Sequence, residues 1–215
     1  MTEDQTAMEE TTLLSDHATE VIGVLIMSLT AVVGAWTGFQ ADRWGGEQVI
    51  ALAESSTARV AGETLIIEAE QLRDIDSGIF ISWLSATVEG EAELADVLSQ
   101  QFPPTLEEAM EPWLGSDPLA NPDAPVTPFD DYTYETHEQG LALTAQANAH
   151  QVDALRFARN GQKYTAMAIL FATVILFAAL AGKVRHEHGR LAMLGLSVIG
   201  LLVGVGLVIR MPVAL

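Results

Sequence analysis

The first candidate for chemistry is a stripe of acidic, small and hydroxyl-bearing residues near the start of the chain. Its members follow one another at alternating spacings of four and three residues, the heptad register of a helix in a left-handed bundle. They are Asp16, Glu20, Gly23, Met27, Thr30, Gly34, Thr37 and Ala41. If several copies placed this face around a common axis, rings of carboxylates would precede hydroxyls and exposed backbone, which favours cations. The stripe therefore identifies a pore-lining candidate.

The same stripe is also typical of helix packing, because small residues let apolar helices approach closely. Gly34 and Gly38 form a GxxxG pair, and Gly200 and Gly204 repeat it later in the chain. A looser version is formed by Ala168 and Ala172. Packing and conduction remain two open interpretations of one pattern.

The elements that position this stripe follow from composition. Of 215 residues, 49% are hydrophobic and only 18% are charged, which is too apolar for an average soluble domain of this length. Three uncharged runs, 21–39, 164–182 and 191–209, each match the roughly 20 residues of helix that cross a bilayer core. The first is preceded by no Lys or Arg and is longer than the ~7–15-residue core of a signal peptide, so we expect it to remain as an anchor.

The sequence thus predicts an all-α integral membrane protein with three transmembrane helices. The expected organisation is an acidic tail (1–20), helix 21–39, an acidic helical extramembrane domain (40–163), helix 164–182, a short basic loop (183–190), helix 191–209 and a tail (210–215).

The segment 40–163 contains 22 carboxylates against five arginines and one lysine, a net charge of −16. Its pattern is helical, because a mostly apolar stripe recurs at spacings of three and four. The stripe consists of Val49, Ala53, Thr57, Val60, Thr64 and Ile67. With a formal charge of −19 for the whole chain, nucleic acid is excluded as a partner.

Within this segment we expect the first span to continue as a helix to about Arg73, a second helix from Ser77, and a third around Leu94. Thr105 with Glu108 is a capping-box start for a short helix. Four prolines then prevent helix between Pro118 and Pro128, and a long helix returns from about Thr133 into the second span. The expected architecture is an antiparallel hairpin of two long helices, capped by short helices.

Aromatic and polar residues lie where the first two spans meet this domain, as an interfacial belt would. We expect these residues to be interface anchors: Trp36, Gln40, Arg43, Trp44 and Tyr164. Trp83 and Trp113, each in a short amphipathic stretch, are expected in the domain core.

Catalytic signatures are absent from the sequence. There is no cysteine and no GxGxxG, P-loop, HExxH or GxSxG motif, so we expect neither an enzyme nor a cofactor. His186-Glu187-His188 and the Asp74/Asp76 pair are possible cation ligands, but residues in such positions are more often part of a solvated turn or a helix cap, so no metal site is expected.

Orientation depends on Lys and Arg near the span ends, and here the counts conflict. The domain side has Arg43, Arg156, Arg159, Lys163 and Arg210, and the other side has Lys183, Arg185 and Arg190. The short loop is nevertheless the more densely basic, and long acidic segments translocate largely regardless of charge. Residue types alone leave the side open.

Several segments resemble an uncharacterised family of small bacterial membrane proteins with three spans. These segments are Trp36 to Gln48, Pro118 to Phe129 and Leu170 to Thr173. The resemblance covers the order of elements along the whole chain and implies no activity. It implies a bacterial inner membrane, a cytoplasmic N-terminus and a domain outside the cytoplasm, although the acidic tail departs from the family's basic one.

Two functions follow as hypotheses. One is a homo-oligomeric, cation-permeable channel, with the first span lining the axis and the acidic domains forming a vestibule. The alternative is a non-conducting structural or accessory membrane protein that docks a partner through its spans or its acidic domain.

Overall fold

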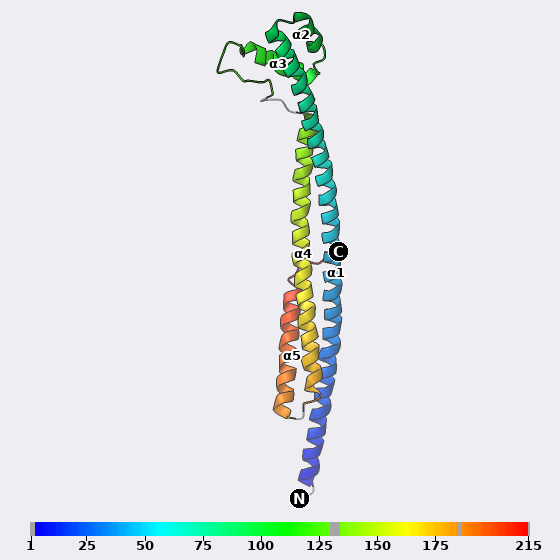
Figure 1. Cartoon of the computed structure of the whole chain (residues 1–215). Helices are drawn as coiled ribbons and strands as arrows, with labels where there is room; N and C mark the ends of the chain where they lie inside the picture. The colour runs from blue at the N-terminus through cyan, green and yellow to red at the C-terminus, as the bar shows by residue number, and fades with distance from the viewer. Residues whose placement is uncertain (1–2, 130–133, 185, 215) are drawn as a thin grey trace. The chain divides into compact units, whose positions relative to one another are not determined.

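The computed structural model describes residues 3–129, 134–184 and 186–214, with side chains from Thr19 onward. The chain is 84% helical, and no strand occurs in these ranges. The helices are α1 (Glu3–Glu89), α2 (Ala92–Ser99), α3 (Pro104–Gly115), α4 (Glu135–Ala181) and α5 (Glu187–Val208) (Figure 1). The prediction of an all-helical fold is confirmed.

Three of these helices, α1, α4 and α5, are long and apolar enough to cross a membrane. The chain divides into two compact units: unit 1 is Met1–Leu52 with Gln151–Leu215, and unit 2 is Ala53–His150. Both α1 and α4 contribute residues to each unit, whereas α5 belongs to unit 1 and α2 and α3 belong to unit 2.

The expected break between Arg73 and Ser77 is wrong, because α1 continues unbroken to Glu89. Asp74 and Asp76 do not end the helix, and no proline lies in this stretch. The Asp76 carboxylate accepts a hydrogen bond from the Tyr134 hydroxyl, so this side chain does not compete for the α1 backbone. The helix ends at Glu89, and the next residue, Gly90, has a φ of +80°, which is left-handed and suits glycine.

The core of unit 1 is formed by α1, α4 and α5 together. Ile26 of α1, Phe171 and Val174 of α4, and Leu194 and Leu201 of α5 make one buried cluster. The apolar residues that remain exposed on these helices, such as Leu25 and Val32, face outward. Each helix therefore has one face for its neighbours and one that a lipid would suit.

In unit 2, α1 and α4 meet at two glycines. A Cβ on Gly62 would lie 2.8 Å from the carbonyl oxygen of Gly140, and a Cβ on Gly140 would lie 2.8 Å from that of Gly62. Ser55 donates to the carbonyl of Ala147 at 2.8 Å on one side of this crossing, and Tyr134 donates to Asp76 on the other. Later residues of α1 thus contact earlier residues of α4.

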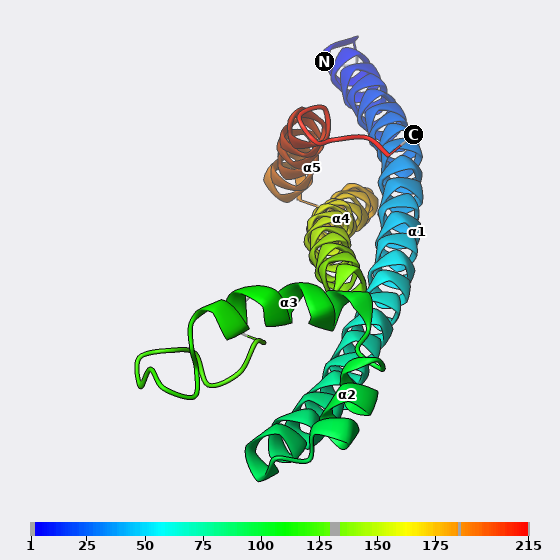
Figure 2. The ribbon, with the colours of Figure 1, turned by 90° about the horizontal axis from the view of Figure 1, so that it is seen from above.

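An aromatic cluster joins the rest of unit 2 to α1. Phe80, Leu106, Met110, Trp113 and Phe129 are all buried in it, and the Trp113 indole donates to the carbonyl of Pro125 at 2.8 Å. The predicted core position of Trp113 is confirmed, while Trp83 is half-buried against the same cluster. In Figure 2, α2 and α3 lie beside the part of α1 that ends at Glu89.

The expected capping box at Thr105 is wrong in its position. The residue before the first turn of α3 is Pro103, with an extended backbone and no side-chain cap hydrogen bond. Pro104 then occupies the first helical position, where its fixed φ suits the helix and its missing N–H leaves no donor unpaired. Proline therefore starts this helix in place of a hydroxyl.

Candidate functional site

The small and polar stripe of α1 faces this chain's own helices. Thr30 and Thr37 have an exposed fraction of 0%, and Gly23 is buried as well. Gly34 lies against α4, since a Cβ there would be 3.5 Å from the Cβ of Phe171. Met27 packs half-buried against the core cluster of unit 1. The stripe is an internal packing face of a single chain.

The hydroxyls on this face bond to their own helix. Thr30 donates to the carbonyl of Ile26 at 2.6 Å, and Thr37 donates to the carbonyl of Gly34 at 2.7 Å. Ser197 of α5 does the same toward Met193 at 2.9 Å. Each buried donor is satisfied within one turn of helix, which is what an apolar environment requires of a hydroxyl.

The acidic start of the stripe differs from the rest of it. Glu20 is exposed at the end of the bundle and lines a cavity there. The backbone of Asp16 is helical within α1, and its side chain lies outside the described residues. Glu20 is therefore the carboxylate of the stripe whose side chain the structure describes.

The glycines of α5 mark its closest approach to α4. A Cβ on Gly200 would lie 2.7 Å from Cγ2 of Val174, and one on Gly204 would lie 2.6 Å from Cε1 of Phe171. The structure thus places both members of this GxxxG pair at a helix contact. Gly38 and Ala172 are both exposed and Ala168 is half-buried, so helix packing at these positions stays a prediction.

Three of the expected interface anchors instead bind the segment that follows α5. Gln40 donates through Nε2 to the carbonyl of Ala214 at 3.3 Å and accepts the Ala214 N–H through Oε1 at 2.9 Å. Trp44 and Tyr164 both donate to the carbonyl of Pro212, at 3.2 and 3.1 Å. Gln40 and Tyr164 are fully buried, so these side chains hold a backbone segment rather than reaching outward.

The remaining two expected anchors are more open. Trp36 is 45% exposed and its ring centroid lies 5.9 Å from that of Phe39, which is also exposed. Arg43 is half-buried. The exposed rings of Trp36 and Phe39 are compatible with the predicted interfacial belt, which stays a prediction.

The possible cation ligands do not assemble into a site. Asp76 is buried beside Tyr134, whereas Asp74 points to an exposed face two residues earlier. His186, Glu187 and His188 are exposed at the start of α5. Across the described residues, no group of three or more His, Asp or Glu side chains is arranged to hold a metal ion.

A second stripe on α1, in unit 2, is exposed in the part of the chain that the structure describes. We call Ala53, Thr57, Val60, Thr64 and Ile67 the outer seam. All five are exposed, Val60 to 61% and Ile67 to 52%. Thr57 donates to the carbonyl of Ala53 at 2.9 Å and Thr64 to that of Val60 at 2.8 Å. Because both hydroxyl protons bond to the helix backbone, the seam presents mainly methyl groups to its surroundings.

Sequence reasoning missed two contacts, the Gly62–Gly140 crossing and the docking of Pro212 and Ala214. The signal for the crossing was an isolated glycine inside each of two strongly helical stretches, where glycine costs about 1 kcal/mol relative to alanine. The contact between Gln40 and Ala214 joins residues 174 positions apart, and no local sequence pattern predicts it.

Comparison of the chain with protein-family models, with curated proteins and with solved structures gives no match.

Proposed function

We propose that this chain is an integral membrane protein that associates with copies of itself through the outer seam and serves a structural, non-conducting role. The two long helices form an antiparallel hairpin whose acidic part lies outside the bilayer. Three helices that are long and apolar enough to cross a membrane support the membrane placement.

The observation that favours a structural role over conduction is the burial of Thr30 and Thr37. A pore along an axis between copies needs its lining side chains on a surface that other copies can reach. These two hydroxyls are 0% exposed against the chain's own α4 and α5, and each is bonded to its own helix. Conduction would require α1 to leave this packed bundle.

The partner for the outer seam is argued from the chemistry of its surface. Its spacing of four, three, four and three residues is the heptad repeat, which keeps an apolar stripe facing a second helix over several turns. The inner face of α1 uses Ala51, Ser55, Gly62 and Ala69 for contacts within the chain, so the helix has two seams on opposite sides. In a bundle of more than two helices, each helix contacts neighbours on two sides and therefore has two seams.

A second copy of this chain fits the seam because the bilayer holds both copies at the same depth. Two copies inserted with the same orientation are parallel, so Val60 of one lies at the depth of Val60 of the other. An axis along the membrane normal then brings identical residues together, as in a closed oligomer with cyclic symmetry. No additional recognition element is needed to fix the register.

The acidity of the extramembrane segment opposes this association. Its net charge of −16 makes neighbouring copies repel one another, and glutamates such as Glu63 and Glu70 are exposed close to the seam. Since the Debye length falls from about 30 Å at 0.01 M salt to about 8 Å at 0.15 M, we expect association to strengthen as salt is added. Cations attracted to this acidic surface would also weaken the repulsion between copies.

We propose that the membrane is the bacterial inner membrane and that the acidic segment lies on its outer side. The dense positive charge of the loop at Lys183 and Arg190 supports a cytoplasmic loop. Because the chain has no cysteine, a single cysteine at Leu119 or at Glu187, both exposed, reports the side directly. A membrane-impermeant maleimide should label the first in intact cells and the second only after lysis.

The experiment that tests the proposal is the mass of the particle in nanodiscs, followed by ion flux from liposomes. We expect a particle of two or more copies at 0.15 M salt, fewer copies at low salt, and no flux under voltage, calcium or tension. A strictly monomeric particle contradicts self-association. Flux that Thr30→Val alters would restore the channel hypothesis, since that change removes only the hydroxyl.

A further inference from the structure

A cavity of ≈ 440 Å³ opens between α1, α4 and α5 at one end of unit 1. It lies where the first apolar run begins, where the second ends and where the third begins. Leu52 of α1 and Gln151 of α4 lie toward the other end of unit 1, so in a membrane this cavity and those two residues are at opposite boundaries. Its volume falls within the range of about 300–1,000 Å³ typical of small-molecule sites.

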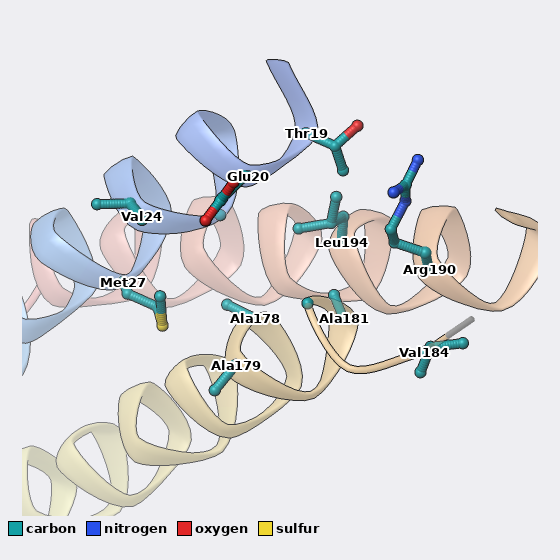
Figure 3. Close-up of a pocket in the computed structure, with 12 residues that line it drawn as sticks. Thr19, Glu20, Val24, Met27, Ala178, Ala179, Ala181, Val184, Arg190 and Leu194 are labelled. Atoms are coloured by element: carbon teal, nitrogen blue, oxygen red, sulfur yellow. The ribbon is translucent and has the colours of Figure 1, made fainter. Parts of the chain in front are cut away.

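Apolar side chains from all three helices form part of the wall of the cavity. Figure 3 shows Met27 of α1, Ala178 and Ala181 of α4 and Leu194 of α5 around it. Alanines and the neighbouring glycines keep this wall shallow, which leaves space that a larger side chain would fill. A flexible hydrocarbon chain suits such a surface because it fills an irregular apolar space without needing hydrogen bonds.

Among the residues whose side chains the structure describes, one carboxylate and one guanidinium line the cavity. Glu20 of α1 supplies a carboxylate and Arg190 of α5 supplies a guanidinium, and Thr19 lies beside them (Figure 3). A guanidinium binds a phosphate through two parallel hydrogen bonds, and a carboxylate accepts hydrogen bonds from an ammonium. The rim therefore complements a ligand with both charges, and the wall complements a ligand with an alkyl chain.

We propose that this cavity binds one phospholipid with a zwitterionic, primary-ammonium headgroup. Arg190 holds the phosphate, Glu20 accepts hydrogen bonds from the ammonium, and an acyl chain lies on Met27, Ala178 and Leu194. A trimethylated ammonium of the same charge has no N–H to donate, so Glu20 distinguishes the ethanolamine headgroup from choline. The bound lipid closes the open end of the three-helix bundle.

The test uses full-length protein released into mild detergent from nanodiscs that contain equal amounts of ethanolamine and choline phospholipids. Native mass spectrometry then counts the lipids that each chain retains. We expect one retained lipid per chain, with the ethanolamine form enriched about tenfold, as the loss of a charge-assisted hydrogen bond implies. Equal retention of the two headgroups would overturn the assignment of Glu20.

Matched variants locate the effect in the cavity. Arg190→Gln should lower retention of both lipids about tenfold, and Glu20→Gln should abolish the preference for ethanolamine while leaving retention of choline lipid unchanged. The controls Lys183→Gln and Glu187→Gln remove the same charges on exposed side chains at the same end, outside the lining. If these controls lower retention as much, a general surface charge holds the lipid and the proposal fails.

A variant that fills the cavity gives an independent test. Ala179 is exposed and lines the cavity, so Ala179→Leu should displace the lipid without disturbing the core. Ala172→Leu, two turns earlier on the same exposed face of α4, is its control. Retention unaffected by Ala179→Leu would contradict the site. The proposal rests on the membrane placement of the three helices and not on self-association, so a monomer that retains the lipid still supports it.

Discussion

Val32 and Val60 are two valines on the same helix with nearly equal exposed fractions, 69% and 61%. In the proposed membrane placement, lipid would cover the outward-facing valine and leucine of unit 1 and solvate their methyl groups well. The same placement would leave unit 2, which is strongly acidic, in water, where each fully buried methyl-bearing side chain would recover about 1.5–3 kcal/mol. Under the proposal, one exposure pattern therefore has two interpretations, and the second is the reason for proposing a protein partner.

The largest contrast is expected from placing aspartate at these two positions. Val32→Asp puts a carboxylate within an apolar span, at a cost of about 2.5–3.5 kcal/mol of insertion free energy. Val60→Asp lies on an exposed face and should change folding stability by less than about 0.5 kcal/mol. We expect a smaller membrane-integrated fraction for the first, and normal insertion with a lower particle mass for the second. Equal behaviour of the two variants would mean that they share one environment.

A second large effect is expected at Gln40, where unit 1 buries a polar side chain completely. Gln40→Leu leaves the N–H and the carbonyl of Ala214 without their partner, and each buried unpaired group costs about 1–3 kcal/mol. The segment that contains Ala214 should then detach from α1. Maleimide labelling of Ala214→Cys measures this, and we expect at least a tenfold faster rate with Gln40→Leu. An unchanged rate would show that Trp44 and Tyr164 hold the segment alone.

The close-approach glycines test whether the two units are packed equally tightly. Gly204→Ala and Gly140→Ala introduce a Cβ into contacts of 2.6 and 2.7 Å, and overpacking of this kind costs about 1–3 kcal/mol. Gly38→Ala and Gly78→Ala have no atom within 4 Å and should be neutral or stabilising by up to about 1 kcal/mol. Thermal loss of helical circular dichroism should rank the four in these two pairs, and a drop for Gly38 or Gly78 would contradict the assigned faces.

The smallest effect is expected at the buried threonines. Thr30→Val and Thr37→Val keep the shape and remove a hydroxyl that bonds only to its own helix, so stability should change by no more than about 1 kcal/mol. Thermal unfolding and particle mass should both match the parent protein. A loss of assembly in either variant would show that copies meet at this face after all.

The apolar runs made the helical fold predictable, because about 20 uncharged residues have few alternatives to a membrane-crossing helix. The unbroken course of α1 was not predictable in the same way. Asp74 and Asp76 resemble a helix end in sequence, whereas in the structure the Tyr134 hydroxyl, 58 residues further along, donates to the Asp76 carboxylate inside the helix.

The sequence predicted the stripe of the candidate site, but it did not predict which helix the stripe contacts. Thr30, Gly34 and Thr37 have the spacing of a packing face, and spacing is the same whether the neighbour is the chain's own α4 or another copy. The outer seam had an equally clear pattern, and its exposure could be learned only once Ala51, Gly62 and Ala69 were seen to occupy the inner face.

The central claim is that copies meet along the outer seam, and disulfide crosslinking of single cysteines tests it most directly. Val60→Cys and Ile67→Cys lie on the seam, while Ala61→Cys is exposed but turned by about 100° around the helix. A disulfide requires two Cβ atoms about 3.5–4.5 Å apart, so it forms only where copies meet face to face. Under mild oxidation in membranes, we predict a crosslinked dimer from the two seam positions and little from Ala61→Cys. Equal crosslinking at Ala61, or none at the seam, would contradict the account.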